Sequence, residues 1–326
     1  MTAPALERRV RPGEERELDL VVSEKLVVAD GVIEVRLRNA DGAPLPRWQP
    51  GAHVDLKVGD CGWRQYSLCG DLHDRSTWRL AILREPDGRG GSRWVHDNLE
   101  VGTQLRAIGP RNRFVLEPAH RYLFLAGGIG ITPLLPMVAA AEQTGADWRM
   151  VYGGRRRESM AFAAELSARY GERVEIRPEN EFGLLDLEGL LSEPDGSTFV
   201  YCCGPDALLT AVLEQGRIRG WDDGDIRVER FAAVEADAAS DQDFVVELAS
   251  TGQTVTVGAG ESILVALRRA GIDPPYSCEE GICGTCVTRV LAGSVEHRDA
   301  VLDDHERASL MALCVSRSTG RLVLDL

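Results

Sequence analysis

Alternating apolar and polar positions characterise the first third of the chain. Residues 19–39, 53–58 and 78–85 form short stretches in which apolar and polar positions largely alternate, and turn residues separate them. A period of two places alternate side chains on opposite faces of a strand. The pattern therefore predicts an antiparallel β-barrel over about residues 17–116.

A different pattern follows from about Arg121 to Phe231. Apolar stretches at 122–128, 148–154, 173–178 and 198–204 are short, and most of them are followed by a glycine turn and a segment with helical periodicity. Alternating strands and helices favour a doubly wound parallel sheet. Residues 122–141 carry no charge, but their glycines and prolines would break a membrane-spanning helix. We expect a buried strand, a turn and a helix ending near Gly145.

The last part of the chain predicts a small α+β domain. Residues 232–242 are small and acidic, as in an exposed connection. A hairpin is expected at 243–258, an amphipathic helix at 261–271, and strands at 286–293 and 321–326. The predicted domains are an antiparallel barrel at 1–117, an α/β domain at 118–231, the connection at 232–242 and the α+β domain at 243–326.

Composition and charge narrow the function. The chain has 326 residues, 44% of them hydrophobic and 27% charged, which suits several globular domains. With 37 basic and 51 acidic residues the net charge is −14, which disfavours nucleic acid as a partner. The N-terminus is charged where a secretory signal would be apolar, so we expect a cytoplasmic protein with no membrane association. Its eight cysteines should then be reduced and serve metals or catalysis.

Four cysteines near the C-terminus form the most specific chemical pattern. They are spaced C-x4-C-x2-C, and the fourth follows after 27 residues. This is the arrangement of plant-type 2Fe-2S clusters. Glycines at 281 and 284 permit a tight loop whose backbone amides could donate to the sulfurs. The candidate ligands are Cys278, Cys283, Cys286 and Cys314; a zinc site or buried structural thiols are the alternatives. The segment resembles a plant-type ferredoxin with the β-grasp fold, which implies one-electron transfer.

A flavin motif lies in the predicted barrel. Arg64, Tyr66 and Ser67 fit R-x-Y-S, a motif of ferredoxin-reductase-like flavin barrels. Residues two apart on a strand face the same way, so Arg64 and Tyr66 could serve a phosphate and the flavin plane. The glycine turn at 88–92 offers free amides to a terminal phosphate. Further candidate contacts are Ala81, Leu83, Gly90, Gly91 and Ser92. Taken alone, Tyr66 could equally be a core aromatic and the turn a surface loop.

Two glycine turns mark a candidate dinucleotide site. The sequence GGIGITP at 127–133 follows an apolar strand and opens a helix, whose amides and dipole could hold a phosphate. The sequence CGP at 203–205 ends a later strand, at the edge where open α/β sheets bind ligands. This pair resembles the pyridine-nucleotide half of the ferredoxin-reductase superfamily, which implies contacts from Gly127, Gly128, Gly130, Thr132, Cys203, Gly204 and Pro205. In this resemblance Phe231 would neighbour the flavin; otherwise it is a core aromatic.

Three arginines, Arg155, Arg156 and Arg157, follow the strand at 148–154. The first two are candidate ligands for the extra phosphate of NADPH. They could equally belong to a solvated loop, and the family resemblance favours NADH. The choice between NADH and NADPH stays open.

The order barrel, nucleotide domain, ferredoxin is similar to that of the phthalate dioxygenase reductase and vanillate O-demethylase reductase family across nearly the whole chain. The resemblance implies FMN, NAD(P)H and a 2Fe-2S cluster as cofactors. It also implies electron transfer to a separate terminal oxygenase, most often a Rieske non-haem iron enzyme met transiently. The residues nearest the hydride transfer would be Tyr66, Ser67, Thr132, Cys203 and Phe231. We expect a monomer.

Two other functions remain open. The chain could serve a haem monooxygenase or a small acceptor such as a quinone or a ferric chelate. Alternatively, it could be a redox-responsive binding module that has lost hydride chemistry, although its intact flavin and nucleotide motifs argue against this.

Overall fold

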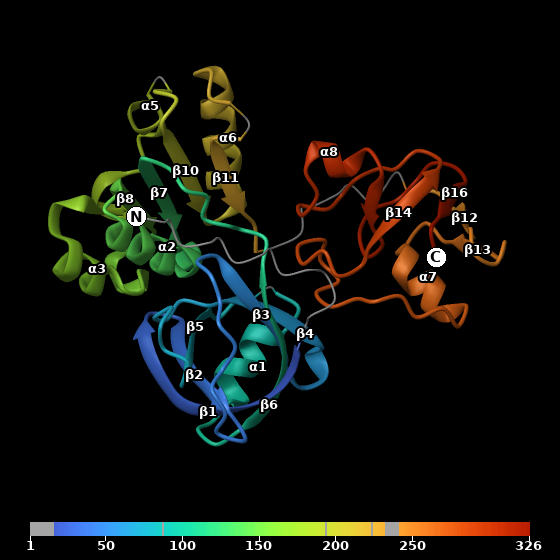
Figure 1. Cartoon of the computed structure of the whole chain (residues 1–326), viewed down its shortest axis with the longest axis horizontal. Helices are drawn as coiled ribbons and strands as arrows, with labels where there is room; N and C mark the ends of the chain where they lie inside the picture. The colour runs from blue at the N-terminus through green and yellow to red at the C-terminus, as the bar shows by residue number, and fades with distance from the viewer. Residues whose placement is uncertain (1–15, 87, 193, 223, 232–240) are drawn as a thin grey trace, which may run out of the picture. The chain divides into compact units, whose positions relative to one another are not determined.

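The computed structural model describes residues 16–86, 88–192, 194–222, 224–231 and 241–326. The chain divides into two compact units, Met1–Glu229 and Arg230–Leu326. The first unit holds two sheets and the second holds one (Figure 1).

The first sheet is antiparallel and six-stranded, in the order β4-β3-β6-β1-β2-β5. Its outer strands, β4 and β5, also lie side by side, so the sheet curves into a barrel with a seam between them. A short helix, α1, follows β5, and Lys25 Nζ donates to the carbonyl oxygens of His96 and Leu99 at its C-terminal end, at 2.7 and 2.8 Å. The elements are β1 (Arg16–Ala29), β2 (Val32–Asn39), β3 (Ala52–Lys57), η1 (Gly59–Cys61), β4 (Trp63–Ser67), β5 (Trp78–Leu83), α1 (Gly91–Asn98) and β6 (Gln104–Asn112).

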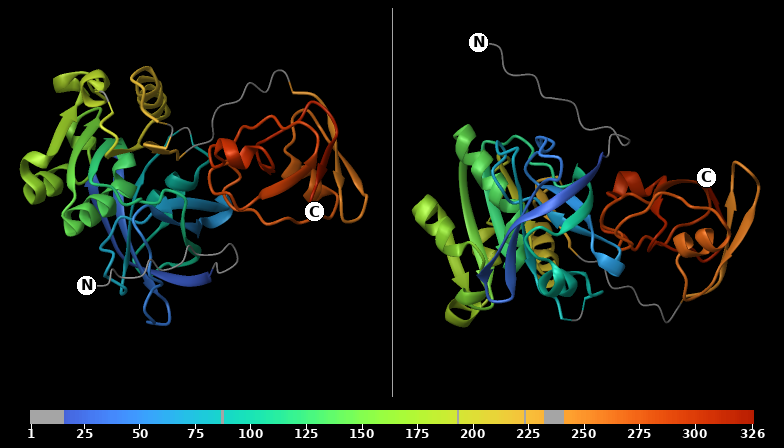
Figure 2. Two further views of the ribbon diagram at one scale, coloured as in Figure 1. Left: turned by 45° about the horizontal axis from the view of Figure 1, so that its top comes forward. Right: turned by 90° about the horizontal axis from the view of Figure 1, so that it is seen from below.

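The second sheet is parallel and five-stranded, in the order β11-β10-β7-β8-β9. Successive β7 residues belong to different core clusters: Phe124 packs with residues of α2 and α3, and Leu125 packs with residues of α6. Helices cover both faces of the sheet (Figure 2). The doubly wound prediction is confirmed. The elements are β7 (Arg121–Gly127), η2 (Gly128–Gly130), α2 (Ile131–Thr144), β8 (Asp147–Gly154), η3 (Arg157–Ser159), α3 (Ala163–Tyr170), η4 (Gly171–Arg173), β9 (Val174–Pro178), α4 (Glu179–Phe182), α5 (Leu187–Leu190), β10 (Thr198–Cys203), α6 (Asp206–Ile218) and β11 (Ile226–Glu229).

The chain reverses direction across this second sheet. It passes from β7 to β8 and β9, then crosses back to β10 on the other side of β7. The carboxyl ends of β7 and β10 therefore border the topological switch point, where open α/β sheets bind ligands.

The second unit is a mixed five-stranded sheet, β13-β12-β16-β14-β15, that packs on one main helix. Ser262 caps this helix, α7, by accepting a hydrogen bond from the Val265 amide. Buried Ile263, Leu264 and Leu267 pack against the sheet, as the amphipathic pattern predicts. The elements are β12 (Phe244–Leu248), β13 (Thr254–Val257), α7 (Ile263–Arg269), β14 (Val287–Ala292), α8 (Asp304–Arg307), β15 (Leu310–Ala312) and β16 (Leu322–Leu324).

The uncharged run and the predicted connection have different outcomes in the structure. The uncharged run at 122–141 forms β7 and α2, and within the described ranges no helix is long and apolar enough to cross a membrane. Residues 232–240 of the predicted connection lie outside the described residues. Asp241 and Gln242, its last two residues, contact Arg298 and Arg317 of the second unit.

Candidate redox site

The predicted flavin residues lie at the seam of the barrel. Arg64, Tyr66 and Ser67 belong to β4, and Ala81 and Leu83 belong to β5. Tyr66 is half-buried against the barrel core, so the core interpretation holds for part of its side chain. Ser67 and Ala81 are buried. The structure thus brings both candidate segments to one side-by-side pair of strands.

A cradle for an anion forms where α1 begins. Gly90 precedes the helix with φ +86°, and a Cβ on Gly91 would lie 2.7 Å from Cγ and Nε of Arg64. The Arg64 side chain therefore passes directly over the first helical residue. A guanidinium beside the free amides of a helix N-terminus suits a phosphate. Ser92 accepts a hydrogen bond from the Glu85 amide at 3.0 Å, so its hydroxyl also has a structural role.

The two glycine turns of the nucleotide fold are in backbone contact. A Cβ on Gly130 would lie 2.2 Å from the Cys203 carbonyl oxygen, and one on Gly204 would lie 2.9 Å from the Gly127 Cα. A Cβ on Gly127 would also lie 2.8 Å from Pro205 Cδ. The prediction that both turns face one site is consistent with this contact, which lies at the switch point of the sheet.

Thr132 and Cys203, predicted next to the nicotinamide, are both buried. The Thr132 hydroxyl donates to the Ile129 carbonyl oxygen at 3.0 Å and so stabilises the turn. Burial, and then the neighbouring Glu229 carboxyl, raise the pKa of the Cys203 thiol well above its usual value. Cys203 is therefore a neutral thiol at neutral pH and not a nucleophilic thiolate.

Glu229 is a candidate site residue that sequence analysis missed. It pairs in register with Cys203, across β10 and β11. Burial raises its pKa to about 8, and its Oε2 has no hydrogen-bond partner within the described residues. A carboxyl held protonated beside the switch point can donate a hydrogen bond to a ligand. An acidic residue ending a predicted strand, in the sequence VERF, was the available signal.

The three arginines after β8 differ in their surroundings. Arg157 pairs with Glu181 at 2.9 Å. Arg155 and Arg156 are exposed, and their guanidinium groups have no hydrogen-bond or ion-pair partner in the part of the chain that the structure describes. Because β8 adjoins β7, these two cations lie one strand away from the glycine turn.

Phe231 lies two residues after the end of β11 and is 38% exposed. The interpretation as a core aromatic is therefore wrong. Phe231 belongs to the second unit, whereas the flavin segment belongs to the first, so its contact with a flavin stays a prediction.

The four cysteines of the ferredoxin segment come together in two pairs. The Cys278 and Cys283 thiols are hydrogen-bonded to each other, and so are those of Cys286 and Cys314. The hydrogen bond from Cys278 lowers the pKa of Cys283 to about 6, while the same contact raises the pKa of Cys278. All four side chains are buried, which limits access of solvent to the sulfurs.

The loop supplies backbone donors to these sulfurs, as predicted. The amides of Glu280 and Thr285 donate to Cys278 and Cys283 at 3.3 and 3.5 Å, and the Gly281 amide donates to Cys314. Positive φ angles of 69° at Gly281 and 73° at Gly284 allow this tight path.

This donor set fits a two-iron cluster better than a single ion. Within the described residues, no three His, Cys, Asp or Glu side chains are arranged to hold one metal ion. Two thiol pairs, each able to bind one iron when deprotonated, match the four-cysteine ligation of a 2Fe-2S cluster.

Comparison with known proteins extends these findings. Residues 246–319 match the family described as a 2Fe-2S iron-sulfur cluster binding domain. The vanillate O-demethylase oxidoreductase of Pseudomonas putida is 39% identical over 95% of this chain and its own full length. The solved phthalate dioxygenase reductase, described as a modular structure for electron transfer from pyridine nucleotides to [2Fe-2S], is 34% identical. That match has a TM-score of 0.73 and covers 95% of this chain and 98% of the reductase.

One further match is to part of a longer chain. An intact type IV self-sufficient cytochrome P450 monooxygenase is 44% identical over 95% of this chain, with a TM-score of 0.86. This chain spans only 41% of that P450 chain.

Proposed function

Because the chain belongs to the family of phthalate dioxygenase reductase and vanillate O-demethylase oxidoreductase, we propose that it is the reductase component of an oxygenase system. It takes electrons from NAD(P)H and passes them through FMN and a 2Fe-2S cluster to a terminal oxygenase. The comparisons support an oxidoreductase with this modular order, and the site geometry supports the role of each module.

The nucleotide fold binds and orients the electron donor. The amides of the turn at 127–130 and the start of α2 would hold the pyrophosphate, because the contact between Gly130 and Cys203 leaves the backbone free of side chains there. Thr132, Cys203 and the neutral Glu229 carboxyl would border the nicotinamide. Arg155 and Arg156 are placed for the phosphate that distinguishes NADPH from NADH.

The barrel holds the flavin at its seam. Arg64 and the amides at Gly90 and Gly91 would bind the phosphate, while Tyr66 and Ser67 would contact the ring. The bound FMN supplies the conversion between a two-electron donor and a one-electron acceptor. The protein contributes orientation, phosphate anchorage and exclusion of water.

The two cysteine pairs would bind the 2Fe-2S cluster, the last electron carrier in this chain. Their backbone donors offset the negative charge of a thiolate-bound cluster, and their burial limits its hydration. This pairing is the observation that carries the proposal, because a donor set of two thiol pairs suits an iron-sulfur cluster and few other groups.

One experiment tests all three modules together. We expect the purified protein, prepared without oxygen, to show both flavin and 2Fe-2S absorption, with FMN released by acid and identified by chromatography. Anaerobic addition of NADH or NADPH should bleach both bands. A colourless protein without iron and flavin would overturn the proposal, and a cluster without flavin reduction would instead favour a redox-responsive binding module.

The partner is a separate oxygenase, and we propose a Rieske non-haem iron enzyme met in a transient complex. The net charge of −14 would favour a basic docking surface on that partner. We further propose that the chain is monomeric and acts in the cytoplasm, where its eight free cysteines would stay reduced.

A haem monooxygenase is the second candidate acceptor. The observation that favours it is the 44% identity with the reductase-like part of a self-sufficient P450. Single-turnover transfer to a purified Rieske oxygenase and to a ferric P450, measured side by side, distinguishes the two acceptors.

A further inference from the structure

A buried carboxylate lies directly behind the cysteine loop of the second unit. Asp299 is 2% exposed. Its Oδ2 accepts a hydrogen bond from the Leu302 amide at 3.0 Å, and its Oδ1 accepts one from the Ser316 hydroxyl at 3.1 Å. His297 Nδ1 lies 3.5 Å from Oδ1. Asp299 is not one of the residues proposed to bind the flavin, the nucleotide or the cluster.

Gly281 lies between Asp299 and the sulfur of Cys314. A Cβ on Gly281 would lie 3.1 Å from the Asp299 Cα, so the two backbones are in contact. The Ala300 amide donates to the Gly281 carbonyl oxygen at 3.0 Å, and the Gly281 amide donates to the sulfur of Cys314. The position of Asp299 therefore affects a donor to that sulfur.

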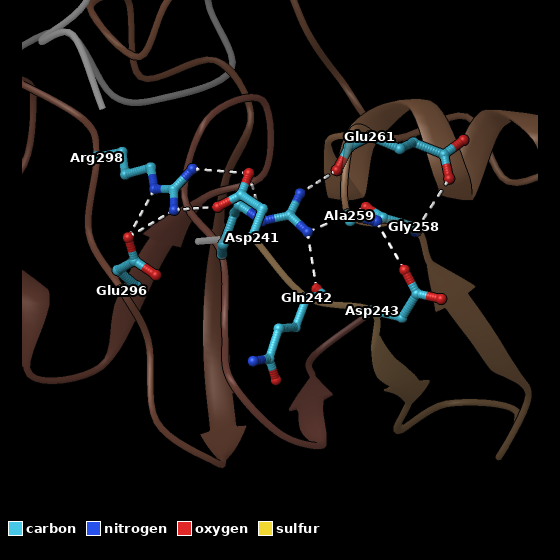
Figure 3. A network of polar contacts seen from close by, with 9 residues as sticks. Asp241, Gln242, Asp243, Gly258, Ala259, Glu261, Glu296 and Arg298 are labelled. Atoms are coloured by element: carbon cyan, nitrogen blue, oxygen red, sulfur yellow. Dashed lines mark hydrogen bonds and ion pairs between the residues drawn. The ribbon is translucent and has the colours of Figure 1, made fainter. Parts of the chain in front are cut away.

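The segment that carries Asp299 is fixed on both sides. Arg307 Nη2 donates to the Asp299 carbonyl oxygen at 2.8 Å. The neighbouring Arg298 binds Asp241 at 3.2 Å and Glu296 at 2.8 Å through its guanidinium (Figure 3). The Arg298 amide also donates to the Ser316 hydroxyl at 3.3 Å, the group that binds Asp299. These contacts hold the carboxylate in the interior, where solvent does not screen its charge.

We propose that Asp299 is a positioning residue for the cluster and lowers its reduction potential. This inference rests on the proposed 2Fe-2S cluster at the four cysteines. Reduction adds one negative charge, and a fixed carboxylate nearby makes that addition less favourable in a medium of low dielectric. The same carboxylate holds the segment against Gly281 and so orients the amide that donates to Cys314.

The test compares two neutral substitutions four residues apart in sequence. Asp299→Asn keeps the shape and removes the charge. Asp303→Asn removes an exposed charge at the cap of α8, where asparagine is also a good capping residue. The holoprotein of each is titrated anaerobically at low and high salt, and the cluster is followed by its visible and electron paramagnetic resonance spectra.

We expect Asp299→Asn to shift the cluster potential to more positive values at both salt concentrations. The expected change is roughly tenfold in the one-electron equilibrium, or about 59 mV. Asp303→Asn should leave the potential unchanged at high salt, because surface charges are screened.

An unchanged potential in Asp299→Asn, or an equal shift in both variants, would overturn the proposal. Asp299→Ser is a second neutral variant, whose hydroxyl can still accept from the Leu302 amide, and the same shift is expected of it. Loss of iron from both Asp299 variants would show a purely structural role and would also overturn it. Absence of iron from the unmodified protein would instead count against the proposed function.

Discussion

A Cβ atom on Gly130 would lie 2.2 Å from the carbonyl oxygen of Cys203. This relationship joins two turns that are more than seventy residues apart in sequence and places them at the switch point of the parallel sheet. Real Cβ atoms do not approach backbone oxygens so closely, so any side chain at position 130 must displace one of the turns. The geometry of the proposed nucleotide site thus depends on the absence of a single methyl group.

Gly130→Ala should therefore weaken both the fold and dinucleotide binding. Overpacking of this kind costs about 1–3 kcal/mol. We expect a lower melting temperature and weaker NADH binding, measured by thermal unfolding and by titration of the holoprotein. Gly224→Ala is the matched control, because a Cβ there meets no atom within 4 Å. Equal melting temperatures and equal NADH binding in the two variants would contradict the close contact between Gly130 and Cys203.

Sequence periodicity predicted the sheets well because alternation and helical spacing are local properties. The strands at 121–127 and 198–203 and the helix at 131–144 formed as expected. The helix at 91–98 was missed, because it is short and begins with glycine, a residue that the sequence indicated for a turn. The capped turn at 304–307 was missed for the same reason of length.

The site was predicted less completely, for tertiary reasons. The spacing of the cysteines predicted a common site for four thiols, and the structure brings these thiols together in two pairs. Their role as cluster ligands stays a prediction. The burial of Glu229 depends on the strands packed around it, and no sequence pattern reports that burial. The hydrogen bond between Ser92 and the Glu85 amide likewise depends on how the turn folds back on itself.

Arg64→Ala should loosen the flavin. Loss of a charged hydrogen bond to a phosphate costs about 2 kcal/mol, which is about thirtyfold in the dissociation constant. The measurement is the flavin retained after gel filtration, and added FMN should restore it. Arg38→Ala, an exposed arginine of β2, is the control and should retain flavin as the unmodified protein does.

Replacement of Arg155 and Arg156 by alanine should reduce the use of NADPH more than that of NADH. Each exposed guanidinium that pairs with the extra phosphate contributes about 1 kcal/mol, so kcat/KM for NADPH should fall by about tenfold or more. The value for NADH should change by less than about twofold. Arg157→Ala is the control, since this residue is paired with Glu181. Failure of the unmodified protein to use NADPH at all would remove the hypothesis.

Cys283→Ser should abolish the visible absorption of the cluster and leave flavin reduction by NAD(P)H intact. The thiol lies in the cluster loop of the second unit, whereas the predicted flavin and nucleotide residues, apart from Phe231, lie in the first. Stopped-flow reduction of the flavin, followed without oxygen, measures the difference. Cys69→Ser, outside the loop, is the control, because a serine hydroxyl can also donate to the Arg79 carbonyl oxygen, as the Cys69 thiol does. An equal loss of flavin reduction would show that the proposed order of electron transfer is wrong.

Glu229 should make stability depend on pH. Its pKa is raised by burial from 4.5 to about 8, so the folded protein holds this proton more tightly than the unfolded chain. The stabilisation is present below the pKa of the unfolded chain and is lost as the pH rises through the pKa of the folded protein, by at most about 1.4 kcal/mol per pH unit.

Glutamine cannot lose a proton. The melting temperature of Glu229→Gln, relative to that of the unmodified protein, should therefore rise between about pH 5 and about pH 8 and then level off. Glu214→Gln, on the exposed side of α6, should show no such trend. A flat difference for Glu229→Gln would mean that the carboxyl is hydrated and charged at neutral pH, and it could not then donate a hydrogen bond beside Cys203.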